Sequence, residues 1–128
     1  MRAFRVPFDG LLAPAEAVTW LAGEERPFAL IGEWLGGLSV LGSSPARVAA
    51  ADEDPFTVID EQPEIAGGEA LVGGGWVGWL GYGLGGLIEQ LPPSPPAPVV
   101  CPGFSLAFYD HVVAVSYTHL TLPTICSV

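Results

Sequence analysis

Few side chains in this sequence are of the types that carry out catalysis. Asp110 and His111 are adjacent, and a carboxylate beside an imidazole is a pair that can orient a general base. Neighbouring residues of a strand point to opposite faces, so we expect a structural role for both. Cys101 stands in a proline-rich stretch with no base near it in the sequence, which predicts an incidental thiol rather than a nucleophile. Residues 1–114 contain no histidine cluster, no Ser/His/Asp set and no carboxylates paired at a useful spacing.

The most distinctive stretch is residues 70–92, ALVGGGWVGWLGYGLGGLIEQLP. It holds eight glycines and has no charge before Glu89. Glycine allows backbone turns with positive φ and close approach of another layer, and four of these positions are Gly74, Gly75, Gly78 and Gly81. Because the stretch is uncharged and apolar, we expect it to be buried, with its large aromatic residues in core or interdomain packing. These are Trp76, Trp79 and Tyr82.

Two other interpretations of this stretch are weaker. A membrane-spanning helix needs about 20 apolar residues, but each glycine costs about 1 kcal/mol of helix propensity relative to alanine, and no Lys or Arg flanks the segment to set an orientation. A dinucleotide fingerprint at Gly73-x-Gly75-x-x-Gly78 must open a helix, whereas here further glycines and then prolines follow. We therefore expect neither a membrane span nor a dinucleotide site.

The composition is that of one acidic globular domain. A chain of 128 residues can bury a real core, and 50% apolar residues exclude a disordered chain. A net charge of −10 repels nucleic acid and anionic membranes. No apolar run of signal-peptide length follows the first residues, and Cys101 and Cys126 form no disulfide framework. We expect a cytoplasmic protein that binds neither nucleic acid nor membrane.

Apolar runs separated by turn residues predict an α+β domain with antiparallel sheets and two short helices. The expected strands cover residues 5–9, 28–34, 38–42, 47–50 and 103–114, with a hairpin turn at Leu35-Gly36-Gly37 and a bulge or bend at Asp110-His111. Residues 91–102 are a proline-rich, exposed connection.

The two expected helices each begin at a proline. The first starts at Pro14 and ends at Gly23. The second follows Asp54-Pro55, where Asp54 caps the free N–H groups, and Pro63 ends it. Phe56 and Ile59 are expected to face inward from this second helix.

Residues 115–128 form a separate unit. Val115 to Thr124 resembles the translation of a transposase sequencing adapter, which implies that the native reading frame ends near Ala114 and that 115–128 is a non-native tail. The alternative is a native strand, since VSYTHLTL alternates with period two. On the first interpretation the native domain, residues 1–114, is incomplete.

The glycine stretch resembles a motif of component I of aminodeoxychorismate synthase. The matching pattern is Gly74-Gly75-x-x-Gly78-x-x-Gly81-Tyr82-x-Leu84-Gly85 followed by Glu89-x-Leu91-Pro92. Gly83 stands where that family usually has Asp. The order of expected elements from residue 28 to 114 is also similar to the family's N-terminal domain, including Tyr109-Asp110 in the last strand. Component I of anthranilate synthase carries a looser version of the motif.

This resemblance implies a chorismate-binding enzyme family. The complete family enzyme aminates chorismate to 4-amino-4-deoxychorismate for 4-aminobenzoate and folate synthesis, with ammonia from a glutamine amidotransferase, component II. Mg²⁺ binds the substrate carboxylate. The residues that hold Mg²⁺ and chorismate, and the lysine nucleophile, belong to a C-terminal domain outside this sequence, which contains no lysine at all. We expect no catalytic, cofactor-binding or metal-binding residue here, and a fragment that is inactive alone.

The resemblance also places a tryptophan pocket in the N-terminal domain. Its remnant would comprise Ile31, Glu33 and Ser39, with Glu33 where the family has serine. A carboxylate there could pair with a ligand ammonium group, or it could be a rim carboxylate at the end of a strand.

Two alternatives remain open for the whole chain: a fragment of anthranilate synthase component I, and a small non-catalytic domain whose Gly/Trp surface docks a partner or an aromatic ligand. A truncated domain should also expose an apolar patch larger than a few hundred Å².

Overall fold

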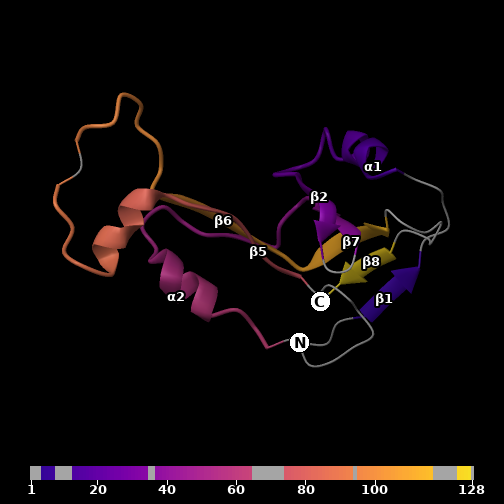
Figure 1. Ribbon diagram of the computed structural model, residues 1–128. Helices are drawn as coiled ribbons and strands as arrows, with labels where there is room; N and C mark the ends of the chain where they lie inside the picture. The colour runs from indigo at the N-terminus through magenta and orange to yellow at the C-terminus, as the bar shows by residue number, and fades with distance from the viewer. Residues whose placement is uncertain are drawn as a thin grey trace.

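The computed structural model describes residues 4–7, 13–34, 37–64, 74–93, 95–116 and 124–127. Every strand pairing in this part of the chain is antiparallel, and the helices are short, which confirms an α+β fold on antiparallel sheets (Figure 1). The elements in chain order are β1 (Phe4–Pro7), α1 (Pro14–Trp20), β2 (Phe28–Trp34), β3 (Leu38–Gly42), β4 (Arg47–Val48), α2 (Pro55–Asp60), β5 (Gly75–Leu80), the 3-10 helix η1 (Tyr82–Leu87), β6 (Phe104–Tyr109), β7 (His111–Ser116) and β8 (Thr124–Ser127).

The strands form two sheets that share one continuous piece of chain. The larger sheet has the order β1-β8-β7-β3-β2, and the smaller one has the order β4-β6-β5. β6 belongs to the smaller sheet and β7 to the larger, and the bend at Asp110 is all that separates them (Figure 1). The expected bend at Asp110-His111 is therefore confirmed. Residues 35–36, where we expected the hairpin turn, lie outside the described part of the chain, but β2 and β3 do pair antiparallel.

The two faces of the larger sheet are buried against different layers, as the alternation of side chains along a strand requires. On β3, Leu41 packs with Ala17 of α1 and with Val115 of β7. Val40, its neighbour on the opposite face, packs with residues of β6 and β7, including Tyr109. The larger sheet thus lies between α1 and the smaller sheet, and its apolar residues on both faces form the core.

The first helix is shorter than predicted. α1 ends at Trp20, with Leu21 as its C-cap, and Gly23 lies beyond it in a turn. The Leu21 N–H donates to the Val18 carbonyl and the Ala22 N–H to the Thr19 carbonyl. These bonds reach back three residues, so they tighten the last turn and end the α-helix before the glycine.

The second helix begins as predicted, with Asp54 as N-cap and Pro55 in its first turn. The Asp54 carboxylate accepts from the Phe56 N–H at 2.9 Å. The inward face was predicted wrongly: Pro55 and Val58 are buried, while Phe56 and Ile59 are only partly buried. The helix also ends at Asp60, before Pro63. Its buried face is therefore formed by only six residues.

The glycine stretch is not buried as a whole, which corrects our expectation. β5 pairs with β6, and Trp76 and Val77 are partly buried there. The following residues leave the core, and the exposed apolar side chains are Trp79, Leu80, Tyr82, Leu87, Ile88 and Leu91. η1 and the proline-rich connection extend beyond the end of the β5–β6 pair, where no further layer of the described chain covers them (Figure 1). Residues 70–73 fall outside the description.

The last residues take part in the larger sheet. Val115 is buried in β7, and β8 pairs with both β7 and β1. These pairings place residues 115–116 and 124–127 in the larger sheet. No helix within the described ranges is long and apolar enough to span a membrane.

Candidate functional site

The residues proposed as a tryptophan-pocket remnant lie at an irregularity between β2 and β3. Leu30 pairs with Val40 and Trp34 with Leu38, so residues 31–33 stand opposite Ser39 alone. Gly32 adopts φ 146°, a conformation that favours glycine, and its N–H donates to Ser39 Oγ at 3.2 Å. The Ser39 hydroxyl therefore satisfies the backbone of the bulge.

The structure places these residues at different depths. Ser39 is 0% exposed, whereas Ile31 is 48% exposed. The Ser39 hydroxyl is occupied by the Gly32 N–H, and Ile31 lies at the surface. The backbone of Glu33 lies in β2, and its side chain is outside the description.

The motif glycines have unequal roles in the structure. A Cβ atom at Gly78 would lie 1.8 Å from the Ser105 carbonyl oxygen, and one at Gly81 would lie 2.6 Å from the Gly103 oxygen. Both positions therefore need glycine because β6 approaches closely. Gly75 has more room, with its nearest contact at 3.9 Å. Gly74 precedes β5, and no role is assigned to it by the structure.

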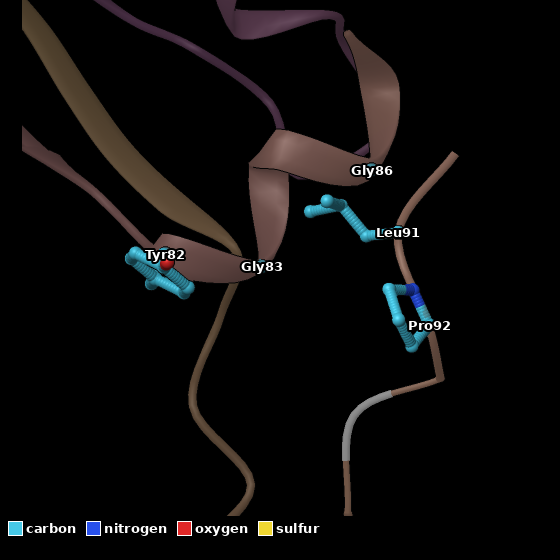
Figure 2. A pocket seen from close by; sticks show the side chains of 5 residues that line it. All are labelled: Tyr82, Gly83, Gly86, Leu91 and Pro92. Carbon is cyan, nitrogen blue, oxygen red and sulfur yellow. The ribbon is translucent and has the colours of Figure 1, made fainter. Parts of the chain in front are cut away.

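Tyr82 and Glu89 lie beyond the strand, at the start and after the end of η1. Tyr82 is 99% exposed, and the Glu89 N–H donates to the Gly85 carbonyl at 3.0 Å while its side chain is exposed. Tyr82 lines an open hollow of about 420 Å³ together with Gly83, Gly86, Leu91 and Pro92. Figure 2 shows Leu91 reaching toward the helix between the two glycines, with the Tyr82 ring to one side.

The described lining of this hollow is mostly apolar. Among the described residues that line it, the one polar side-chain group is the Tyr82 phenol, and none carries a charge. These side chains can pack against an apolar or aromatic group.

Asp110 and His111 meet, contrary to the expectation that they point to opposite faces. His111 Nδ1 lies 2.6 Å from Asp110 Oδ1. The alternation rule fails here because Asp110 occupies the bend between β6 and β7 rather than a strand position. Both side chains are about 40% exposed, and within the described ranges no hydroxyl or thiol hydrogen-bonds to His111. Within the described ranges the pair therefore bridges two adjacent residues at the bend, with no nucleophile bonded to it.

Arg47 forms a cluster that no sequence pattern predicted. Its guanidinium pairs with Glu53 and, at 3.6 Å, with Glu61, the C-cap of α2, and its Cζ lies 5.3 Å from the centre of the Trp76 ring. The Ala50 N–H bonded to Glu53 lowers the pKa of that carboxyl, and Arg47 lowers it further against the effect of desolvation. The spacing of Arg47, Glu53 and Glu61 follows no helical or strand period, so only the fold brings them together.

The residues that the structure describes contain no group of three or more His, Cys, Asp or Glu that could hold a metal ion. Cys101 is an exposed free thiol. Cys126 lies in β8, and its side chain is not described.

Comparison with known proteins adds no relative. No protein-family model matches this chain, and no curated protein is significantly similar to it.

Proposed function

We propose that this chain is the incomplete N-terminal domain of component I of an aminodeoxychorismate synthase, and that it is inactive alone. The proposal is supported by the spacing of the motif from Gly74 to Pro92 and by the order of elements around it. The observation that carries it is the surface formed by that motif: from Trp79 to Leu91 it exposes six large apolar side chains outside the core.

An exposed apolar surface of this kind is typical of a contact with another protein or domain. In the proposed enzyme, the C-terminal chorismate domain covers the surface that begins at Trp79 and includes Tyr82. That domain supplies the residues that bind Mg²⁺ and chorismate, and ammonia comes from the amidotransferase, component II. The N-terminal domain contributes support for this contact, because Gly78 lets β5 lie close against β6 and Gly81 allows the same close approach to Gly103 just beyond the strands.

The first test is to sequence the source locus past the codon for Ala114. The proposal predicts several hundred further codons with a chorismate-binding domain in place of the residues from 115 onward. A native stop codon near Val128 would contradict it. It would favour a small binding domain instead, for which the exposed Tyr82 hollow would be the contact surface.

The second test is enzymatic and separates the two synthases. The longer gene product, mixed with chorismate, ammonium and Mg²⁺, should form 4-amino-4-deoxychorismate, and the 128-residue chain should form none. Formation of anthranilate by the longer product would assign the chain to anthranilate synthase. Aminated product from the 128-residue chain itself would show that catalysis does not need the proposed second domain.

A further inference from the structure

The outer edge of β5 presents backbone groups that no described strand bonds. The orientation of these groups follows from hydrogen bonds on the other side of β6. Ala46 N–H donates to the Phe108 carbonyl and Ala49 N–H to the Leu106 carbonyl, so these β6 residues turn their backbone groups toward β4.

Backbone groups alternate in direction along a strand, so the β6 residues between them turn toward β5. Their partners on β5 are Gly75, Val77 and Trp79. The Gly81 N–H continues this inward set by donating to the Gly103 carbonyl at 2.8 Å. Trp76, Gly78 and Leu80 must therefore direct their N–H and C=O groups outward, away from β6.

Within the part of the chain that the structure describes, this edge lacks the features that protect strand edges. Proteins commonly guard an edge with Lys, Pro, a bulge or a covering element. β5 has the sequence GWVGWL, contains no charge or proline, and pairs with β6 in regular register over its whole length. Trp79 and Leu80 are exposed beside the edge. An edge of this kind is a template for another strand.

We infer that a second copy of this chain pairs with it, β5 against β5 in antiparallel orientation, with Gly78 on the two-fold axis. The axis of such a pair is perpendicular to the sheet, so residues opposite each other must point to the same face. A residue on one copy can therefore pair only with a residue an even number of positions away, so one residue must pair with its own copy on the axis. With Gly78 on the axis, Trp76 pairs with Leu80 and Gly78 with Gly78. Each residue whose backbone groups point outward then has a partner.

The charge distribution places a contact between two copies at β5. The chain carries a net charge of −10, so most surfaces of two copies repel each other. Residues 70–88 are uncharged, and β5 lies within them. β5 itself therefore brings no carboxylate to the seam, and the side-chain pairs formed across it, Trp76 with Leu80 and Val77 with Trp79, are apolar.

Sedimentation equilibrium of the 128-residue chain tests this inference, with Leu80→Pro as the edge variant. Proline removes the outward N–H of Leu80 without removing a bond to β6, and the residue before it is in an extended strand, as proline requires. We expect a concentration-dependent dimer whose dissociation constant rises about tenfold or more in the variant, because a bond is lost on each side of the axis. Ala97→Pro introduces the same residue in the exposed connection and should leave the dimer unchanged.

Amide hydrogen exchange on the unmodified chain gives a second readout that needs no variant. Protection at Trp76, Gly78 and Leu80 should rise with protein concentration, while the Val100 amide, in a residue that is 97% exposed, should exchange rapidly throughout. A chain that stays monomeric at high concentration would overturn the inference. So would a dimer whose affinity is equal in Leu80→Pro and Ala97→Pro, or one without protection at these amides. None of these results depends on whether the reading frame continues past Ala114.

Discussion

The Tyr109 hydroxyl donates a 2.7 Å hydrogen bond to the Arg26 carbonyl, and this bond ties β6 to the turn that precedes β2. Tyr109 is 3% exposed, and its ring packs edge-on against Phe28, 4.6 Å between centroids. Arg26 has φ 45°, a left-handed conformation that its side chain disfavours. The bond thus helps to hold an unfavourable turn.

Replacing Tyr109 by Phe removes this bond and keeps the ring. We expect Tyr109→Phe to lower the free energy of unfolding by about 1 kcal/mol, the usual net value of such a bond. Urea unfolding measures the change. Tyr82→Phe removes a hydroxyl from a fully exposed ring and should leave the stability unchanged; equal losses in the two variants would contradict the role given to the Arg26 contact.

The same tyrosine makes stability depend on alkaline pH. Burial raises the pKa of Tyr109 above its usual value near 10, against the lowering effect of Arg26. The folded state therefore holds this proton more tightly than the unfolded state, and the contribution to stability is complete below about pH 10 and is lost as pH rises through the folded pKa. The free energy of unfolding, measured from pH 9 upward, should fall less steeply with pH in Tyr109→Phe than in the original chain. An identical slope would show that Tyr109 does not carry this dependence.

The close approach of β5 to β6 can be tested at Gly78, with Gly83 as the control position. A Cβ at Gly78 would collide with the Ser105 carbonyl oxygen, whereas nothing lies within 4 Å of one at Gly83. We expect Gly78→Ala to cost more than about 2 kcal/mol of stability, because backbone atoms must shift to admit the methyl group. Thermal unfolding of the two alanine variants compares them directly, and a tolerated Gly78→Ala would place β5 farther from β6 than described.

Ser39 is the buried residue whose loss should disturb the β2–β3 bulge. Ser39→Ala leaves the Gly32 N–H without its acceptor, which should cost about 1–3 kcal/mol. Ser43→Ala, at a partly buried serine that makes no hydrogen bond within the described ranges, is the control. Denaturant unfolding of both variants gives the comparison. If the two losses are equal, the hydroxyl of Ser39 is not what satisfies Gly32.

Sequence patterns predicted the elements whose signals are local. β2 and β3 match the expected residues because their apolar runs are bounded by proline, glycine and serine. The start of α2 was predictable because Asp54 and Pro55 act within one turn of helix. The end of α1 was not, since the backbone bonds to Val18 and Thr19 end that helix before Gly23 does.

Properties that depend on a second layer could not be predicted in the same way. The apolar content of residues 70–92 indicates that this stretch has apolar surface to bury. It does not indicate whether another layer of the fold lies against that surface. The Trp76 ring packs against Phe108 and Arg47, while Tyr82 is 99% exposed. At the proposed pocket remnant, the bulge decides that Ser39 is buried and Ile31 exposed, and a bulge depends on how two strands pair.

The single-residue connection between β6 and β7 has a mechanical consequence. A force applied to the smaller sheet passes through Asp110 into the strand that lies in the middle of the larger one. Tyr109 and Val112, on either side of that point, share one apolar cluster with Val40. Peeling either sheet away would open the cluster that anchors the other, so the domain should yield as one unit rather than sheet by sheet.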